Sequence, residues 1–189
     1  MTLPTLQHRR ATETDRETLL AMRKSCGWGT DRIDSYISEP SWVTYLFFRP
    51  TEDGKGEQPV GMGCLVFDIP GDPTMANREQ GVIAITSLFV FPECRASGVG
   101  NQTFTMLEQL AIHEYGAKTL AVDTRAYEIP WASEGESSYL KKWYERRGYV
   151  EYRPPIRRYA QDNHPDCVDS PDKSVLLYAC FLRKEVGKS

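Results

Sequence analysis

The sequence predicts a single α/β domain built on a mixed, mostly antiparallel sheet with a central pair of parallel strands and flanking helices. Residues 82–90 form an almost unbroken apolar run of β-branched and aromatic residues, which is typical of a central strand buried on both faces. A helix with apolar residues at three-to-four spacing follows at 101–115, and a second apolar strand follows at 119–124. Strand, helix and strand with this spacing imply a right-handed crossover, and therefore parallel pairing of the two strands.

Length and composition indicate one ordinary globular domain, 1–189, with a folded core at 3–182 and a frayed tail at 183–189. A chain of 189 residues is long enough to bury roughly two thirds of its unfolded surface without staples. The net charge of −3 argues against a nucleic-acid partner, because binding to phosphates draws on clustered Lys and Arg. A cationic or small neutral partner fits this balance better.

We expect reduced thiols and no bound metal. The five cysteines are widely spaced, include no Cys-x-x-Cys pair and do not combine with the three histidines in a zinc-like pattern. The N-terminus has no apolar leader, and no window approaches 18 consecutive apolar residues. We therefore expect a soluble, cytoplasmic protein with no membrane partner, and its oligomeric state stays open.

Apolar spacing, capping residues and chain breakers divide the first ninety residues into strands and helices. In chain order we expect a strand at 6–11, a helix from Thr12, a second helix from about Thr30 to Glu39, a hairpin of strands at 42–48 and 60–69, and the central strand at 82–90. Gly61 and Gly63 indicate a bulge or a tight approach of the backbone. We expect the acidic residues near the connection 70–80 to be solvated, although any of them could face an amine: Asp68, Asp72 and Glu79.

The rest of the chain continues the alternation. The helix from Asn101 ends at Gly116, and a helix at 137–147 ends at Gly148. The loop between 125 and 136 is either a lid that selects the acceptor or a decorative insertion. Two closing strands are expected at 149–152 and 175–182, separated by a polar stretch.

The loop after the central strand has the composition of an anion-binding site. Pro92 ends the strand, and the two glycines, Gly98 and Gly100, let a ligand approach the backbone at the start of the next helix. The first N–H groups of that helix have no partner of their own, and the helix dipole favours negative charge there. Arg95 adds a planar guanidinium at the rim, so a diphosphate is the natural ligand.

Two segments resemble motifs of the GNAT acetyltransferase superfamily. The first resembles its acetyl-coenzyme A signature, Arg/Gln-x-x-Gly-x-Gly/Ala after a strand that ends in Val-x-Pro: Val90-Phe91-Pro92-Glu93-Cys94-Arg95-Ala96-Ser97-Gly98-Val99-Gly100. The second is similar to the aromatic helix end Tyr-Glu-x-x-Gly-Phe/Tyr: Trp143-Tyr144-Glu145-Arg146-Arg147-Gly148-Tyr149. The resemblance covers most of the chain in element order but only 88–104 and 137–149 in motif detail.

The resemblance implies an N-acetyltransferase that moves an acetyl group from acetyl-CoA to a primary amine by direct attack in a ternary complex. The acidic balance of the chain favours a cationic small molecule as the acceptor. The resemblance also implies that the parallel strands splay apart, that pantetheine pairs with the strand backbone and that the pyrophosphate lies on the loop amides. Ser137, where relatives often have Asn, could cap its helix and donate to the coenzyme. The coenzyme-binding residues expected on this basis are Leu88, Phe89, Val90, Arg95, Ala96, Ser97, Gly98, Val99, Gly100, Asn101 and Ser137.

For the chemistry, Tyr144 matches the tyrosine that the family places beside the coenzyme sulfur as general acid, and an aromatic residue on the apolar stripe of a helix is the structural alternative. A phenol is a weaker acid than a thiol, so a hydrogen bond to the leaving thiolate is as credible as proton transfer. A backbone N–H near Phe89 or Val90 would polarise the carbonyl. The glutamate that many relatives carry on this strand is missing, and Asp123 is the candidate base, acting directly or through water; a plain strand-end carboxylate is its alternative.

Two other functions fit the sequence less well. An acyl-CoA-binding module without transfer activity would explain the missing glutamate. A dinucleotide-binding oxidoreductase is suggested by Gly98-x-Gly100-x-x-Thr103, but seven residues separate the strand from the first glycine, and Thr103 stands where Gly or Ala is needed.

Overall fold

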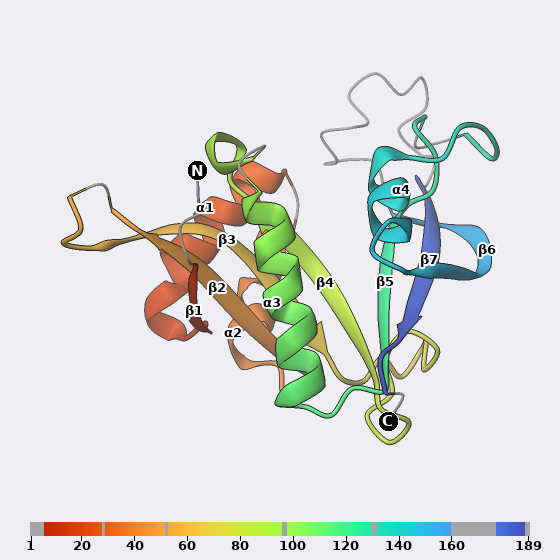
Figure 1. Ribbon diagram of the computed structural model, residues 1–189, viewed down its shortest axis with the longest axis horizontal. Coiled ribbons are helices and arrows are strands. Elements are labelled where there is room, and N and C mark those ends of the chain that lie inside the picture. Colours follow the sequence, from red (N-terminus) through yellow and green to blue (C-terminus); the bar gives the residue numbers. More distant parts are fainter. Residues whose placement is uncertain are drawn as a thin grey trace.

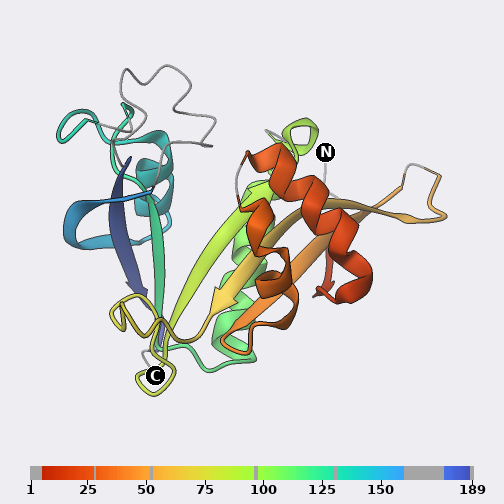
Figure 2. The same ribbon diagram turned by 180° about the vertical axis from the view of Figure 1, so that it is seen from behind.

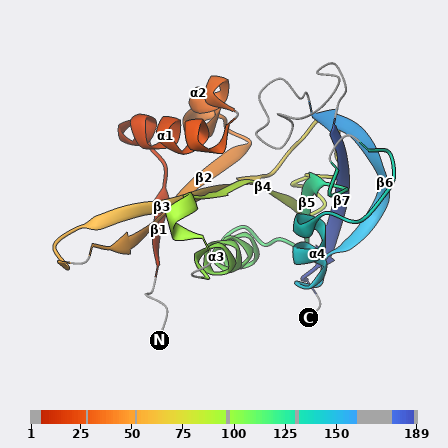
Figure 3. The same cartoon turned by 90° about the horizontal axis from the view of Figure 1, so that it is seen from above.

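The computed structural model describes residues 6–27, 29–51, 53–95, 98–129, 132–159 and 177–187, with the Tyr159 side chain left out. These residues form a seven-stranded sheet in the order β1-β2-β3-β4-β5-β7-β6, with helices on both faces (Figures 1 and 3). The elements are β1 (Gln7–Arg10), α1 (Arg16–Cys26), α2 (Ile33–Ser38), β2 (Trp42–Pro50), β3 (Glu57–Val66), β4 (Val82–Val90), α3 (Val99–His113), β5 (Thr119–Arg125), α4 (Tyr139–Glu145), β6 (Val150–Tyr159) and β7 (Leu177–Glu185). Short 3-10 turns, η1 (Glu13–Asp15), η2 (Thr30–Arg32) and η3 (Pro92–Cys94), precede the first three helices.

The predicted fold class is confirmed. Within the described sheet β4 and β5 pair in parallel and the other neighbouring strands pair antiparallel. Helices α1 and α2 cover one face, and α3 covers the other (Figures 2 and 3). None of the described helices is long and apolar enough to cross a membrane.

Each face of the sheet has its own apolar core. On the α3 face, Phe104 and Leu107 are fully buried because apolar residues recur every three to four positions along the helix. On the α1/α2 face, Leu19 and Met22 of α1 are fully buried against the sheet. Burying a side chain of this size stabilises the fold by about 1.5–3 kcal/mol.

The sheet is divided at its parallel pair. Although β4 runs to Val90 and β5 to Arg125, the two strands pair over only three residues each, ending at Ala84 and Ala121. Beyond that point the strands diverge, which Figure 1 shows as a V. The expected splaying is therefore confirmed, and it separates an N-terminal half (β1 to β4) from a C-terminal half (β5, β7 and β6).

Strand β4 carries a bulge where it leaves β5. Cys64 pairs with Thr86 and Met62 pairs with Phe89, so two steps along β3 correspond to three along β4. Within the bulge Ser87 has φ of +52°, which few non-glycine residues adopt. The bulge redirects the backbone at the end of β4.

The glycines of β3 permit this geometry, as the sequence predicts. A Cβ atom on Gly61 would lie 2.4 Å from the Phe89 carbonyl oxygen, and one on Gly63 would lie 2.5 Å from Leu107 Cδ1. A larger residue at position 61 would collide with backbone, which cannot move aside. Gly61 is therefore required by the close approach of β4.

Two boundaries near the end of the chain differ from the prediction. Strand β6 continues through Pro154 and Pro155 to Tyr159 instead of stopping at 152, because β6 is an edge strand and its pairing with β7 is irregular between Arg153 and Ile156. Residues 183–185 were expected to be frayed, but they belong to β7, where Glu185 pairs with Thr119.

Candidate acyl-transfer site

The N-terminus of α3 presents backbone amides that have no acceptor within the helix. Gly98 precedes the helix with φ of +79°, and no side chain caps it. The first intrahelical hydrogen bond runs from the Gln102 N–H to the Gly98 carbonyl, 3.0 Å, so the N–H groups of Val99, Gly100 and Asn101 have no intrahelical acceptor. Apart from the backbone of the helix itself, no described residue lies within 4 Å of the position of a Cβ on Gly100, so a ligand can approach the backbone there. Ala96 and Ser97, expected in the same site, lie outside the described residues.

Arg95 lies beside this helix start. Its Nε donates to the Val90 carbonyl oxygen, 3.0 Å, and its guanidinium lies 5.8 Å from the centre of the Phe89 ring. The side chain therefore places a positive charge at the end of β4, in the loop that leads to α3.

The end of β4 offers backbone groups toward β5. The Phe91 N–H donates to the Val60 carbonyl on β3, 3.0 Å. Because backbone groups alternate in direction along a strand, the N–H and C=O of the preceding residue, Val90, point away from β3. The side chains of Leu88 and Phe89 pack into the α3 core and the α1/α2 core respectively. The strand thus keeps its hydrogen-bonding edge on the side from which β5 has departed.

Asn101 also joins α3 to α4. Its Oδ1 accepts hydrogen bonds from Trp143 Nε1, 2.9 Å, and from Arg147 Nη1, 3.5 Å. Its side chain is therefore already engaged, and its backbone amide remains in the first turn of α3.

The start of α4 corrects one expectation. Ser138 caps the helix, not Ser137: its Oγ accepts from the Lys141 N–H, 3.0 Å, and donates to the Arg125 carbonyl, 2.6 Å. Ser137 instead forms an isolated β-bridge with Tyr127. Ser138, one residue beyond the predicted cap, has the extended backbone of a cap residue, with φ of −60° and ψ of 152°.

Tyr144 lies in an aromatic cluster beside the opened strands. Its ring contacts Phe104, Trp143 and Tyr149 edge-on, with centroids 4.8–5.8 Å apart. Among the described residues none hydrogen-bonds its hydroxyl group. Burial, and then the negative charge of Asp123, raise the pKa of Tyr144, so the phenol stays protonated and can donate a hydrogen bond. The structure brings the two predicted catalytic side chains close enough to interact electrostatically.

Asp123 points to the other face of β5. Its side chain is only 11% exposed, and its Oδ2 lies 3.5 Å from Nε of Arg158 on β6. Sequence reasoning missed Arg158, because the two prolines before it suggested a polar connection.

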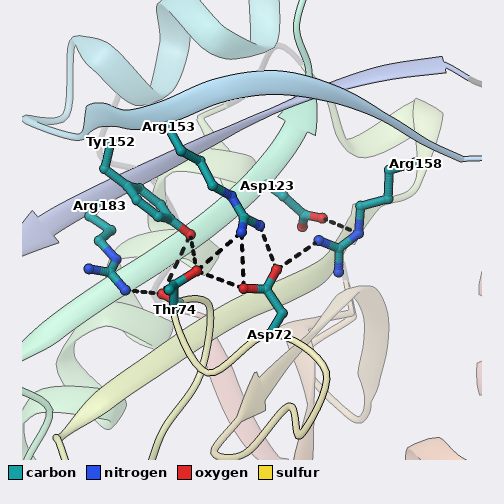
Figure 4. Close-up of polar contacts among 7 residues, drawn as sticks. All are labelled: Asp72, Thr74, Asp123, Tyr152, Arg153, Arg158 and Arg183. Atoms are coloured by element: carbon teal, nitrogen blue, oxygen red, sulfur yellow. Dashed lines mark hydrogen bonds and ion pairs between the residues drawn. The ribbon is translucent and has the colours of Figure 1, made fainter.

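Arg158 is part of a charged cluster on the α1/α2 face, which we call the Asp72 cluster (Figure 4). Arg153 donates through both Nη atoms to the two carboxylate oxygens of Asp72, and Arg158 Nη1 approaches the same carboxylate at 3.3 Å. Thr74, Tyr152 and Arg183 extend the cluster through contacts with one another. Asp72, expected to be solvated, is only 15% exposed.

A second cluster on the α3 face involves Glu108, and we call it the Glu108 cluster. The carboxylate of Glu108, 7% exposed, accepts from Arg147 at 2.7 Å, Lys184 at 2.9 Å and the Tyr149 hydroxyl at 3.2 Å. No signal in the sequence singled out Glu108, because it occupies a helix position among apolar neighbours.

Two surface hollows lie away from these features. The larger, about 380 Å³, is lined by residues at the start of β4 and the end of α3, including Ile83 and Tyr115. Helix α3 separates it from the free amides by about 22 Å, at 1.5 Å per residue. The smaller, about 200 Å³, lies between α2 and β2. In the described part of the chain, no group of three His, Cys, Asp or Glu side chains could hold a metal ion.

Solved structures share this fold at low sequence identity. Spermidine/spermine N-acetyltransferase SpeG from Vibrio cholerae, in complex with manganese ions, is 9% identical with a TM-score of 0.65, covering 96% of this chain and 92% of its own. An Escherichia coli enzyme that acetylates the alanine of a ribosomal protein is 13% identical, with a TM-score of 0.64 and coverage of 97% and 96%. Arabidopsis thaliana NAA60, in complex with a bisubstrate analogue, is 12% identical, with a TM-score of 0.66 and coverage of 96% and 99%.

Sequence comparison identifies the family. No curated protein matches the chain with significant similarity. The profile of the acetyltransferase (GNAT) family matches residues 17–149, which is well over half of the sequence and includes both motifs. The protein therefore belongs to the GNAT family of acyltransferases.

Proposed function

We propose that the protein is an N-acetyltransferase that moves an acetyl group from acetyl-CoA to a primary amine on a small molecule, by direct attack in a ternary complex. The observation that carries the proposal is a combination of two sets of backbone groups. The first-turn N–H groups of α3 have no acceptor within the helix, and the edge of β4 beyond Ala84 no longer pairs with β5. The structural neighbours named for spermidine/spermine and alanine acetylation support an amine as the acceptor.

The residues around α3 fit the phosphates of the coenzyme. The amides of Val99, Gly100 and Asn101 would donate to the diphosphate, and Arg95 would add a charge-assisted contact. The freed edge of β4 at Leu88 and beyond would pair with the amide groups of the pantetheine arm. Phe89, Ser137, Ala96 and Ser97 remain predicted coenzyme contacts.

Acetyl transfer needs a neutral amine. An alkyl amine with a pKa of about 10.4 is neutral in only about one molecule in 2,500 at pH 7. We assign proton removal to Asp123, acting directly or through water. The neutral amine nitrogen then bonds to the carbonyl carbon, the carbon–sulfur bond breaks, and the sulfur leaves as a thiolate. The second proton, which the nitrogen loses as the amide forms, goes to this thiolate through water and gives free coenzyme A. The Val90 N–H, on the β5 side of the strand, would donate to the oxygen that gains negative charge.

Tyr144 would stabilise the leaving thiolate by a hydrogen bond. Because burial raises the pKa of this phenol, full transfer of its proton to a thiolate is unfavourable, and donation without transfer is the better assignment. The family motif and the position of the side chain beside the divergent strands both support this role.

A conservative substitution tests the role of Tyr144. We expect Tyr144→Phe to lower kcat by about 10²-fold, the typical effect of removing one transition-state donor, with little change in acetyl-CoA affinity. Tyr139→Phe on the same helix is the matched control, because Tyr139 is 60% exposed. An unchanged kcat in the Tyr144 variant removes this residue from the mechanism.

A binding measurement separates the proposal from its alternative. Thermal shift and calorimetry with coenzyme A test the amide site, and thiol release on a panel of amines tests transfer. Tight binding of acetyl-CoA without turnover on any amine would indicate a non-catalytic acyl-CoA-binding module. Failure of coenzyme A to bind, or binding that Gly100→Val does not weaken, would contradict the site.

A further inference from the structure

This inference rests on the proposed function and names the class of acceptor. We propose that the acceptor is an amine that also carries a carboxylate, and that Arg158 binds this carboxylate beside Asp123. The argument comes from the charges of the residues drawn in Figure 4.

The first step is the local charge on the α1/α2 face. The seven residues of Figure 4 include three guanidinium groups, on Arg153, Arg158 and Arg183, and two carboxylates, on Asp72 and Asp123. One positive charge is therefore in excess, although the whole chain has a net charge of −3. The overall balance suggested a cationic acceptor, but the charges within this group of seven residues favour an anionic group.

The second step is the distribution of contacts. Arg153 satisfies Asp72 with a two-point interaction and stacks 3.6 Å from the centre of the Phe181 ring. Arg183 donates to the Thr74 carbonyl and lies over the Tyr152 ring, but among the described residues it has no carboxylate partner. Asp72 thus neutralises Arg153, and the excess charge remains with the other two arginines.

The third step identifies Arg158 as the anion-binding group. Its contacts with Asp72 and Asp123 are long, 3.3 and 3.5 Å, compared with about 2.7–2.9 Å for a strong ion-pair hydrogen bond. Its Nη2 has no acceptor among the described residues, and its side chain is 28% exposed. A partly desolvated guanidinium that is held loosely is suited to bind a carboxylate from solution.

The fourth step is the position of Arg158 relative to the chemistry. It lies directly beside Asp123, the proposed base, so one short molecule could place its amine at Asp123 and its carboxylate at Arg158. A second ammonium group on the acceptor would instead meet the excess positive charge. A single excess charge also matches a monoanionic carboxylate better than a dianionic phosphate.

Calorimetry on the intact protein with coenzyme A present tests the inference without turnover. The probes are three four-carbon amines that differ only at the far end: 4-aminobutyrate, butylamine and 1,4-diaminobutane. We expect 4-aminobutyrate to bind about tenfold or more tightly than butylamine, and the diamine to bind most weakly, because a charged hydrogen bond is lost in one case and a like charge is added in the other. Thiol release from acetyl-CoA is then measured on the same three amines.

Variants locate the effect. Arg158→Gln should remove the tenfold preference for 4-aminobutyrate over butylamine, and Arg158→Lys should restore part of this preference. Arg157→Gln is the matched control: the neighbouring guanidinium makes the same charge change, but it faces Tyr178 on the opposite side of β6, and its effect should stay below twofold. Circular dichroism verifies that each variant is folded.

The outcomes separate this inference from the proposed function. Three outcomes with the unmodified protein overturn the inference: equal binding of the three amines, tighter binding of the diamine, or no binding of any of them. These outcomes do so whether or not the protein releases thiol from acetyl-CoA. A preference that survives Arg158→Gln also overturns the role of Arg158. Preferential binding of 4-aminobutyrate with no thiol release supports the inference and contradicts the proposed acetyl transfer.

Discussion

The Glu108 cluster and the Asp72 cluster each link the N-terminal half of the molecule to the C-terminal half, on opposite faces of the sheet. Their charges are paired to different degrees. Because β4 and β5 pair over only three residues, the halves of the molecule need other contacts to stay together. On the α3 face, Glu108 from the N-terminal half binds Arg147 and Lys184 from the C-terminal half. On the α1/α2 face, Asp72 from the N-terminal half binds Arg153 and Arg158.

The difference lies in burial and in how completely the charges are paired. Glu108 is 7% exposed, its partners lie within 3.2 Å, and the aromatic cluster around Tyr144 packs beside it. Asp72 lies on a loop, is 15% exposed, and holds Arg158 only at 3.3 Å. The Glu108 cluster fixes the structure on the coenzyme side, whereas the Asp72 cluster keeps one cation adjustable on the side where we place the acceptor.

Removing the charge of Glu108 should give the largest loss of stability. We expect Glu108→Gln to lower the free energy of unfolding by about 3–5 kcal/mol, because it leaves two partly buried cations without their counter-charge. Urea unfolding followed by circular dichroism measures this, with Glu134→Gln in an exposed loop as the control. If Asp72→Asn proves as costly as Glu108→Gln, the two clusters do not differ as described.

A double-mutant cycle should rank the partners of Asp72. We expect a coupling of about 1–2 kcal/mol between Asp72 and Arg153, between the values for exposed and fully buried pairs. Coupling between Asp72 and Arg158 should be about 0.5 kcal/mol or less. A stronger coupling to Arg158 would mean that this guanidinium is committed to the fold and is not available to a ligand.

The pH dependence of stability should give the smallest effect. Burial alone would raise the pKa of Asp72, but hydrogen bonds from Arg153 and Thr74, with the charges of both arginines, outweigh it and lower the pKa below the usual value of 3.8. A carboxyl group with a lowered folded-state pKa contributes stability above its unfolded pKa and loses it as the pH falls through the folded one. The difference in unfolding free energy between the unmodified protein and Asp72→Asn should therefore have its full value at pH 6 and decrease below about pH 4. A difference in unfolding free energy that stays constant down to pH 3 would exclude this linkage.

The sequence predicted what is encoded locally. The apolar run of β4, the periodic face of α3 and the glycines at its start are each visible within a short window, and the structure has these elements within a few residues of their predicted bounds. The motif around Tyr144 was visible for the same reason. Gly61 indicated a close approach of the backbone, although the sequence did not show that the approaching strand would be β4.

Features that depend on distant partners could not be predicted. Asp72 and Arg153 are separated by 81 positions, and Glu108 and Lys184 by 76, so neither cluster leaves a local pattern. Pro154 and Pro155 made the second part of β6 resemble a connection, because a proline is excluded from an inner strand but tolerated on an edge. Arg158 lies in that segment and was therefore not predicted as part of a strand or a site.

The same two prolines limit how this protein can aggregate. An outer strand normally exposes a row of N–H and C=O groups to which a strand of another molecule can add. Because neighbouring residues of a strand point their N–H groups to opposite sides, one of Pro154 and Pro155 removes a donor from the free edge of β6, and at the opposite edge β1 is only four residues long. Both margins of the sheet are thus poor templates for the addition of a strand from another molecule.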